Sequence, residues 1–473
     1  MRLSNCYNIK RSAKDLEKWE RNFLAQYALK AAERRGNLKE KFRDSCTPSP
    51  LEHRTGYHRD RDRILWSKAF KRLQHKTQVF PHYVEDHYKR RLTHSLEVAQ
   101  IATTVARALR LNEVATEAIA LGHDLGHTPF GHAGESALNK ILNLKLKVIN
   151  TNIQELKNTI RNELNNHSVD SDDNLPIPIF GFDHCVHAIE VVSRIAKEYD
   201  NETNHGGLNL TFDVKDGILK HMCERAKDKE QRPYSNIPDI VKFSEYKIFG
   251  TNKGSLEAQC VYFADKVTYL LGDIEDGVRS DILKYKKLNK DPFFAELSKK
   301  YQYHRKDTKE KLKLESKDDF MLFRSKVLTT LILDCIDNAK KNIKKNGLEK
   351  KNVDEVLSNS ERIVFLSHDL SNSWKVFYKK WMMSYLFKND RVIACSFKAE
   401  KIVTDLFNAY FEKPDLINSE YYEHCEKVYK KLGISDEKFL KLIIVRNYIA
   451  GMTDPFASDQ HARLYMALER IRF

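Results

Sequence analysis

Three histidines, an aspartate and a glutamate gather within fifteen residues, in the segment LGHDLGHTPFGHAGE at 121–135. Neutral imidazole and carboxylate groups together bind divalent metals, and a bound metal makes hydroxide available near neutral pH. A lone histidine is more often a satisfied structural residue, but so many ligand-type groups in one short segment favour chemistry. The adjacent pair His123 and Asp124 therefore predicts a metal-dependent hydrolytic site.

The spacing inside this segment predicts how its groups are presented. His127 follows His123 by four residues, which would place both on one face of a helix. A proline and two glycines within 126–131 then predict a turn. His132 and Glu135 stand three apart at the expected start of the next helix, where the glutamate can hydrogen-bond the imidazole. Such a pair can act as an acid or a base.

A metal site at His123 and Asp124 needs further ligands from distant parts of the chain. His94 lies at the start of an expected helix, and Asp265 lies inside an otherwise apolar one. A buried carboxylate is costly unless it is paired or metal-bound. A helix cap or an ion pair could also explain either residue, so both readings stay open at this point.

Asp265 has polar companions along its helix. Tyr269 and Asp273 follow at steps of four residues, so all three face roughly one direction. Lys266 adds a cation beside the carboxylate. Such a strip could contact, in turn, a metal, a phosphate and a sugar hydroxyl. The alternative interpretation is that Tyr269 is a core residue between two solvated carboxylates.

The elements that must position these groups are helices. Apolar residues recur at spacings of three and four over long stretches, and no segment shows sustained alternation of period two. Glycine and proline are scarce, at 17 and 11 residues. One such stripe comprises Leu92, Leu96, Ala99, Ala102, Ala106 and Leu109. The sequence therefore predicts an all-α fold.

The domain organisation follows from composition. We expect an N-terminal helical arm and a proline-bearing loop over 1–55, a catalytic core over 56–285, and a C-terminal helical region over 286–473 that packs on the core. Residues 141–180 form a probable insertion that begins as a helix and ends as an acidic loop. The lysine-rich segment 284–318 predicts a solvated helix pair or a mobile segment.

Composition limits the function classes. The net charge of +15 predicts phosphate-bearing partners, either a nucleotide or nucleic acid, although a solvated lysine-rich surface would also explain it. The sequence contains no run of about 18 apolar residues, so no membrane span is expected. Eight scattered cysteines without CxxC pairs, and a polar N-terminus without the apolar core of a secretory signal, favour a reduced cytoplasm.

The order of His94, His123-Asp124 and Asp265 resembles the H…HD…D pattern of the HD-domain phosphohydrolases. Flanking segments resemble the bacterial deoxynucleoside triphosphate triphosphohydrolases, the dGTPase-like family, from about residue 20 to the C-terminus. These segments are RDRDRILWSKAFKRLQHKTQVF (59–80), RRLTHSLEVAQIA (90–102), LGHDLGHTPFGHAGE (121–135), GLNLTFDVKDGILKH (207–221), SLEAQCVYFADKVTYLLGDIEDGVRS (255–280) and YIAGMTDPFA (448–457).

The resemblance implies a role for each matching residue. The four metal ligands would be His94, His123, Asp124 and Asp265. The catalytic group would be His132, supported by Glu135, with His127 against the phosphate. Substrate contacts would come from Arg91, Lys266 and His184 at the phosphates, Tyr269 under the deoxyribose, and Gln78 and Asp273 at the 3′-hydroxyl.

The implied reaction is attack of water on the α-phosphorus of a dNTP, with dGTP foremost, which releases a deoxynucleoside and intact triphosphate. The implied cofactor is a divalent metal such as Mg²⁺, Mn²⁺ or another transition metal. A dNTP activator and a homo-oligomer are further expectations by analogy. The alternatives are another HD nucleotide phosphohydrolase, or a single-stranded nucleic-acid-binding protein with a secondary HD site.

The sequence departs from the family pattern at four places. Gly272 stands where a histidine is common, His187 where glutamine is usual in an FxHNxQ-like segment, and Asn447 where aspartate is usual. The segment 141–180 is longer than the usual connection. None of these places is one of the four implied ligands, so the differences concern base preference, regulation and oligomer contacts.

Overall fold

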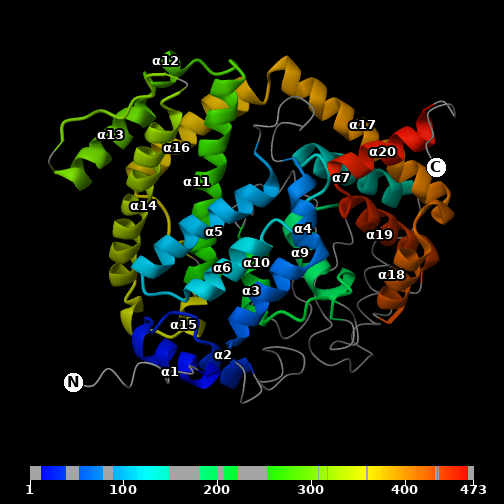
Figure 1. Cartoon of the computed structure of the whole chain (residues 1–473), viewed down its shortest axis with the longest axis horizontal. Coiled ribbons are helices and arrows are strands. Elements are labelled where there is room, and N and C mark those ends of the chain that lie inside the picture. The colour runs from blue at the N-terminus through cyan, green and yellow to red at the C-terminus, as the bar shows by residue number, and fades with distance from the viewer. Residues whose placement is uncertain are drawn as a thin grey trace, which may run out of the picture.

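The computed structural model describes residues 12–38, 53–77, 89–148, 181–199, 207–221 and 253–466, apart from 307, 317, 358, 360, 432, 433 and 435. Across these residues the chain is helical, and none belongs to a strand (Figure 1). The single isolated bridge pairs Thr77 with Arg90. The predicted all-α fold is confirmed. No helix in these ranges is both long and apolar enough to cross a membrane.

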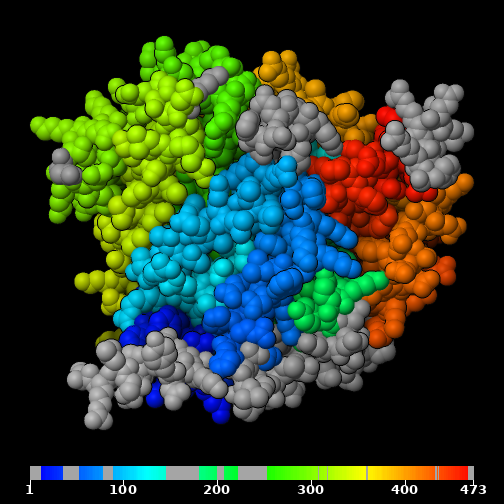
Figure 2. Space-filling view, viewed as in Figure 1, coloured from blue at the N-terminus to red at the C-terminus, as the bar shows by residue number. Residues whose placement is uncertain are grey.

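Four helices form the centre of the molecule. They are α3 (Gly56–Trp66), α5 (Arg91–Ala108), α6 (Glu113–Gly122) and α11 (Leu256–Arg279), which pack closely on one another. Alanines on α5 and α6, among them Ala102 and Ala118, are fully buried, and such small side chains let helices approach closely. Figure 2 shows the blue-to-cyan part of this centre, to which α3, α5 and α6 belong, flanked by green and yellow helices on one side and by orange and red helices on the other.

The stripe expected on α5 is only partly correct. Ala99, Ala102, Ala106 and Leu109 are buried, as expected, but Leu96 is 49% exposed. Helix α5 buries a face that runs through His94, Val98, Ile101 and Val105. Leu96 lies two residues from His94 and therefore points away from that face.

The lysine-rich segment packs on the core rather than standing in solvent. Helices α12 (Tyr285–Leu288) and α13 (Pro292–Arg305) do occupy it. Helix α13 buries Phe293, Leu297 and Tyr301, and it packs against α14 (Phe320–Lys345) and α16 (His368–Phe377). The expected helix pair is therefore present, but the expectation that it is solvated or mobile was wrong, because α13 is amphipathic and buries its apolar side.

A second apolar cluster gathers around α7 (His132–Val148). Helices α17 (Asp390–Glu412), α18 (Ser419–Lys431), α19 (Glu437–Ala450) and α20 (Asp454–Tyr465) contribute to it, and Figure 1 shows them together in orange and red beside α7. Helix α7 begins within the segment 121–135, here called the HD segment, and therefore connects it to the C-terminal helices.

Shorter elements complete the described fold. They are α1 (Ala13–Phe23), α2 (Ala31–Leu38), α4 (Lys68–Arg72), α9 (His184–Glu190), α10 (Phe212–Lys220), α15 (Val353–Leu357), the π-helices η4 (Val191–Ile195) and η8 (Tyr378–Leu386), and the 3-10 turns η3 (Leu73–His75), η7 (Leu348–Lys350) and η9 (Pro414–Leu416). The expected division at 55 and 285 stays a prediction. The helical beginning of 141–180 is confirmed as far as Val148, and the rest of that segment lies outside the described residues.

Candidate active site and metal centre

The HD segment leaves helix α6 before its histidines. Helix α6 ends at Gly122, so His123 and His127 lie in an irregular turn and do not share a helical face. That expectation was wrong. The expected turn over 126–131 is confirmed, and Phe130 adopts a left-handed φ of 60° within it.

The turn packs tightly against α9. A Cβ atom at Gly126 would lie 2.0 Å from the carbonyl oxygen of His184, so only glycine fits there. Asp183 caps α9 by accepting hydrogen bonds from the backbone N–H groups of Cys185 and Val186. The cap fixes where α9 starts, and the glycine lets His184 in its first turn reach the HD segment.

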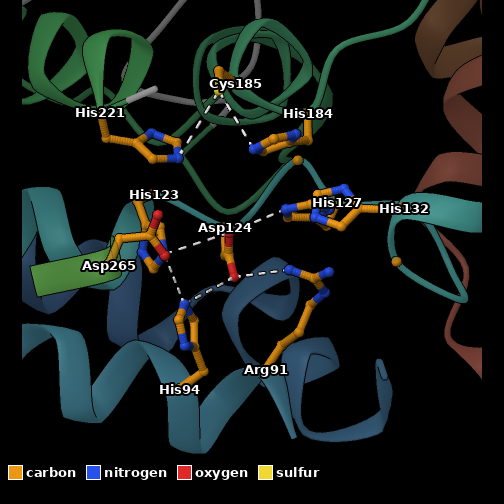
Figure 3. A network of polar contacts seen from close by, with 12 residues as sticks. Arg91, His94, His123, Asp124, His127, His132, His184, Cys185, His221 and Asp265 are labelled. Carbon is orange, nitrogen blue, oxygen red and sulfur yellow. Dashed lines mark hydrogen bonds and ion pairs between the residues drawn. The ribbon is translucent and has the colours of Figure 1, made fainter. Parts of the chain in front are cut away.

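The structure brings together all four predicted metal ligands (Figure 3). His94 Nε2 from α5 lies 3.0 Å from Asp265 Oδ1 of α11. His123 Nε2 lies 3.4 Å from Asp124 Oδ1 and 3.8 Å from Asp265 Oδ1. All four residues are buried. Three segments far apart in sequence therefore present two imidazoles and two carboxylates to one point.

The hydrogen bonding of His123 tests whether this point suits a cation. Its Nδ1 lies 2.6 Å from the carbonyl oxygen of Ala120, which can only accept, so Nδ1 carries the proton. In the neutral imidazole, Nε2 then faces Asp124 and Asp265 with a lone pair and has no hydrogen-bond partner within the described part of the chain. Three electron-rich groups facing one another in a buried place fit a divalent metal ion.

The two carboxylates are in the form that binds metal. Burial acts to raise the pKa of Asp265, but the hydrogen bond with His94 and the charges of His123 and Lys266 bring it well below its ordinary value. Burial likewise opposes ionisation of Asp124, yet the neighbouring histidines and Arg91 hold its pKa well below the usual range.

Arg91 has donors to spare for an anion. One guanidinium nitrogen donates to Asp124 Oδ2 at 2.9 Å, while Nε and Nη2 are buried without a hydrogen-bond partner among the described residues. Arg91 also lines the cavity described below. A buried guanidinium with free donors is suited to phosphate oxygens.

Glu135 joins two histidines on the other side of the turn. Its Oε2 lies 3.3 Å from His132 Nδ1, which confirms the expected contact, and its Oε1 lies 3.1 Å from His184 Nδ1. His184 stacks on His127 with ring centroids 3.8 Å apart. Burial acts to lower the pKa of His184, but Glu135 more than offsets it and the pKa is raised. The side chain of His132 is 47% exposed, whereas those of His127 and His184 are almost fully buried.

A cavity of about 710 Å³ connects these groups. Its walls include Arg91, His132, Asp265, Lys266 and Tyr269. The ring of Tyr269 lies 6.1 Å from that of Tyr378, which also lines the cavity.

The remaining predicted substrate contacts are less well placed. Asp273 is buried on α11, but it is not among the described residues of the cavity wall, so the expected strip reaches the cavity at Asp265, Lys266 and Tyr269 but not at Asp273. Gln78 lies outside the described residues.

Two family models match the chain. The HD domain matches residues 91–179, and the phosphohydrolase-associated domain matches 368–463. Deoxyguanosinetriphosphate triphosphohydrolase-like proteins are similar over nearly the whole chain. The relative from Brucella anthropi is 33% identical over 444 residues, 93% of this chain and 95% of the relative. The relative from Geobacter sulfurreducens is 31% identical, and the match covers 96% of this chain and 97% of the relative. The relative from Ralstonia nicotianae is 32% identical, and the match covers 93% of this chain and 94% of the relative.

The chain belongs to the deoxyguanosinetriphosphate triphosphohydrolase-like family. The resemblance found in the sequence is confirmed, and the protein is an HD-domain phosphohydrolase. The HD match contains His94, His123 and Asp124, whereas Asp265 lies far beyond its end. Only the packing of α11 on α5 and α6 brings that fourth ligand to the other three.

At each described position where this member of the deoxyguanosinetriphosphate triphosphohydrolase-like family departs from the family pattern, the residue contacts an identifiable neighbour. The space beside Gly272 is taken by the side chain of Lys89, 3.3 Å from where a Cβ would be. His187 Nδ1 lies 2.8 Å from the carbonyl oxygen of Gly126 and thereby supports the HD turn. Asn447 donates to the buried carboxylate of Glu190 at 3.1 Å.

Sequence reasoning missed two groups at this site. His221, at the C-cap of α10, is buried with its ring 5.0 Å from that of His123, and it lines the cavity. Cys185 lies between His221 and His184. The sequence signal for His221 was its place at the end of a family-like segment, while a single cysteine outside any CxxC pair carried no signal.

Proposed function

We propose that this protein hydrolyses deoxynucleoside triphosphates, dGTP foremost, to a deoxynucleoside and inorganic triphosphate. The observation that carries the proposal is the convergence of His94, His123, Asp124 and Asp265 beside a cavity that also holds Arg91. The names of the relatives refer to deoxyguanosine triphosphate, which supports the choice of dGTP.

A divalent ion held by these four side chains would supply a Lewis acid and a source of hydroxide at the α-phosphorus. Arg91 and Lys266 would neutralise charge on the phosphate oxygens. His127 and His184 would contact the phosphates from the opposite side. His132, oriented by Glu135, would protonate the departing 5′-oxygen, which suits its partly exposed position on the cavity wall.

The sugar would lie against Tyr269. A ring placed against C2′ leaves no room for a hydroxyl there, so it would exclude ribonucleotides by steric clash. Gln78 and Asp273 are the proposed partners of the 3′-hydroxyl. This part of the proposal rests on the resemblance alone.

The proposal is tested by incubating the full chain with each dNTP and Mn²⁺ and separating the products by chromatography. We expect deoxynucleoside and intact triphosphate in equal amounts, with dGTP consumed fastest. The Asp124→Asn variant, which keeps the size of the side chain, should form no product. Release of pyrophosphate or orthophosphate would overturn the reaction class.

A further inference from the structure

We propose that His184, Cys185 and His221 form a second metal site beside the HD ligands. His184 Nε2 lies 3.4 Å from Cys185 Sγ, and His221 Nε2 lies 3.9 Å from the same sulfur. One donor atom of each residue lies within 4.8 Å of the other two, and all three residues are buried. Figure 3 shows the sulfur between the two imidazoles, above the HD ligands.

The spacing of the donors suits a tetrahedral ion. Zinc lies about 2.3 Å from thiolate sulfur and about 2.0 Å from imidazole nitrogen, so the sulfur and nitrogen ligands of one ion are about 3.6 Å apart. The two distances to Cys185 Sγ fall on either side of this value. Two imidazoles and a thiolate favour Zn²⁺, Co²⁺ or Fe²⁺ over the hard ion Mg²⁺.

The other ring nitrogens hold both imidazoles in the ligating orientation. His221 Nδ1 lies 2.6 Å from the carbonyl oxygen of Ile218, so Nδ1 carries the proton and Nε2 offers a lone pair. His184 Nδ1 is held in the same way by the carboxylate of Glu135. Metal-bound histidines characteristically donate their second N–H to a carboxylate or a carbonyl.

The second site is distinct from the HD ligands but adjoins them. None of its three residues belongs to the set of four, and His221 meets His123 edge to face. His184 and His221 line the cavity, so a fourth coordination position would face water or a ligand. With the second ion bound, His184 would act on the phosphates as a ligand of that ion rather than by direct contact. Another trio, Asp124, His127 and His184, is equally compact. It is less suited to a second cation, because Asp124 already pairs with the guanidinium of Arg91.

The test counts metal and looks for a metal–thiolate bond, so it does not depend on dNTP hydrolysis. The full chain is loaded with Co²⁺ under reducing, anaerobic conditions, and cobalt per chain and near-ultraviolet charge-transfer absorption are measured. We expect two ions per chain and a thiolate-to-cobalt band. Cys185→Ser and His221→Gln should each keep one ion and lose the band. Asp124→Ala should lose the other ion and keep the band.

Cys335→Ser is the matched control, because Cys335 is equally buried but lies on α14, outside both groups. It should keep both ions and the band. One ion per chain without a thiolate band in the unmodified protein would overturn the proposal, and this result needs no variant to fold. A second ion that survives in Cys185→Ser but is lost in His127→Ala would also overturn it, in favour of the other trio.

Discussion

Single carboxylates organise this site by fixing the orientation of more than one neighbour. Glu135 uses its two oxygens for His132 and His184, so both imidazoles present Nε2 away from it. Asp124 contacts Arg91 and His127 while it faces the metal position. Loss of either carboxylate would therefore disturb several groups at once, whereas loss of one histidine isolates one role.

His132→Ala separates catalysis from metal binding. We expect an unchanged metal content at the HD ligands and a rate of dGTP hydrolysis about 10²–10⁴-fold lower, the usual contribution of a general acid. Asp124→Ala should instead lose both the metal and the activity. Metal analysis and steady-state rates on the same preparations check this. Wild-type turnover in His132→Ala would remove the residue from the mechanism.

Tyr269→Ala tests discrimination between sugars. Removing the ring opens space at C2′, so we expect the ratio of kcat/KM for dGTP over GTP to fall at least about tenfold. Tyr269→Phe keeps the ring and should keep the ratio. Competition assays with the two nucleotides measure it, and an unchanged ratio in the alanine variant would contradict the assigned role.

At the scale of elements, the C-terminal helices hold the HD turn in place. Asp454, in the first turn of α20, accepts the backbone N–H groups of Phe130 and Thr77, each at 2.9 Å. The ammonium group of Lys76 donates to the carbonyl oxygens of His127 and Ala450. The segment YIAGMTDPFA thus supports the turn that carries His127 through hydrogen bonds to its backbone.

Asp454→Ala should show this dependence. Two buried N–H groups would lose their acceptor, at a cost of about 1–3 kcal/mol for each group. We expect a lower melting temperature and weaker metal retention, and Asp454→Asn should lie between the alanine variant and the wild type because its amide oxygen still accepts. Calorimetry and metal analysis measure the two effects. A melting temperature equal to that of the wild type would show that the turn is held by other contacts.

At the scale of the whole molecule, a buried glutamate connects the N-terminal arm to the core. Glu257 on α11 accepts the backbone N–H groups of Leu29 at 2.8 Å and Asn112 at 3.1 Å. Burial raises the pKa of Glu257 to about 7, and the hydrogen bonds only partly oppose it. The side chain is therefore protonated in the folded protein at pH values where the unfolded chain is ionised.

The sign of the resulting pH dependence is fixed by that raised pKa. Stability from protonated Glu257 is fully present below about pH 4.5 and is lost as the pH rises through about 7, by an amount on the order of 3 kcal/mol. Glu257→Gln should raise the melting temperature at pH 7.5 and reduce its fall between pH 5 and 7.5. Some slope should remain, because burial also raises the pKa of Glu20 to about 7. An unchanged slope would contradict the assignment.

The net charge is also a property of the whole molecule. The net charge of +15 predicts binding to single-stranded DNA that weakens steeply as salt is added. Electrophoretic shifts at 50 and 200 mM salt would measure it, and no shift at low salt would argue against it. The homo-oligomer and the dNTP activator likewise stay predictions.

The sequence by itself determined the all-α fold and the pairing of His132 with Glu135, and its resemblance to a known family supplied the four candidate ligands. Helical periodicity and the chemistry of imidazole and carboxylate are local properties, and they are readable from a short segment. Only the tertiary structure decided which side chains meet. It showed that α6 ends before His123, that Leu96 faces outward, and that α13 is packed. It also placed Cys185 beside His221. The sequence could not show this contact, because contact between distant segments depends on how the helices pack and leaves no local pattern.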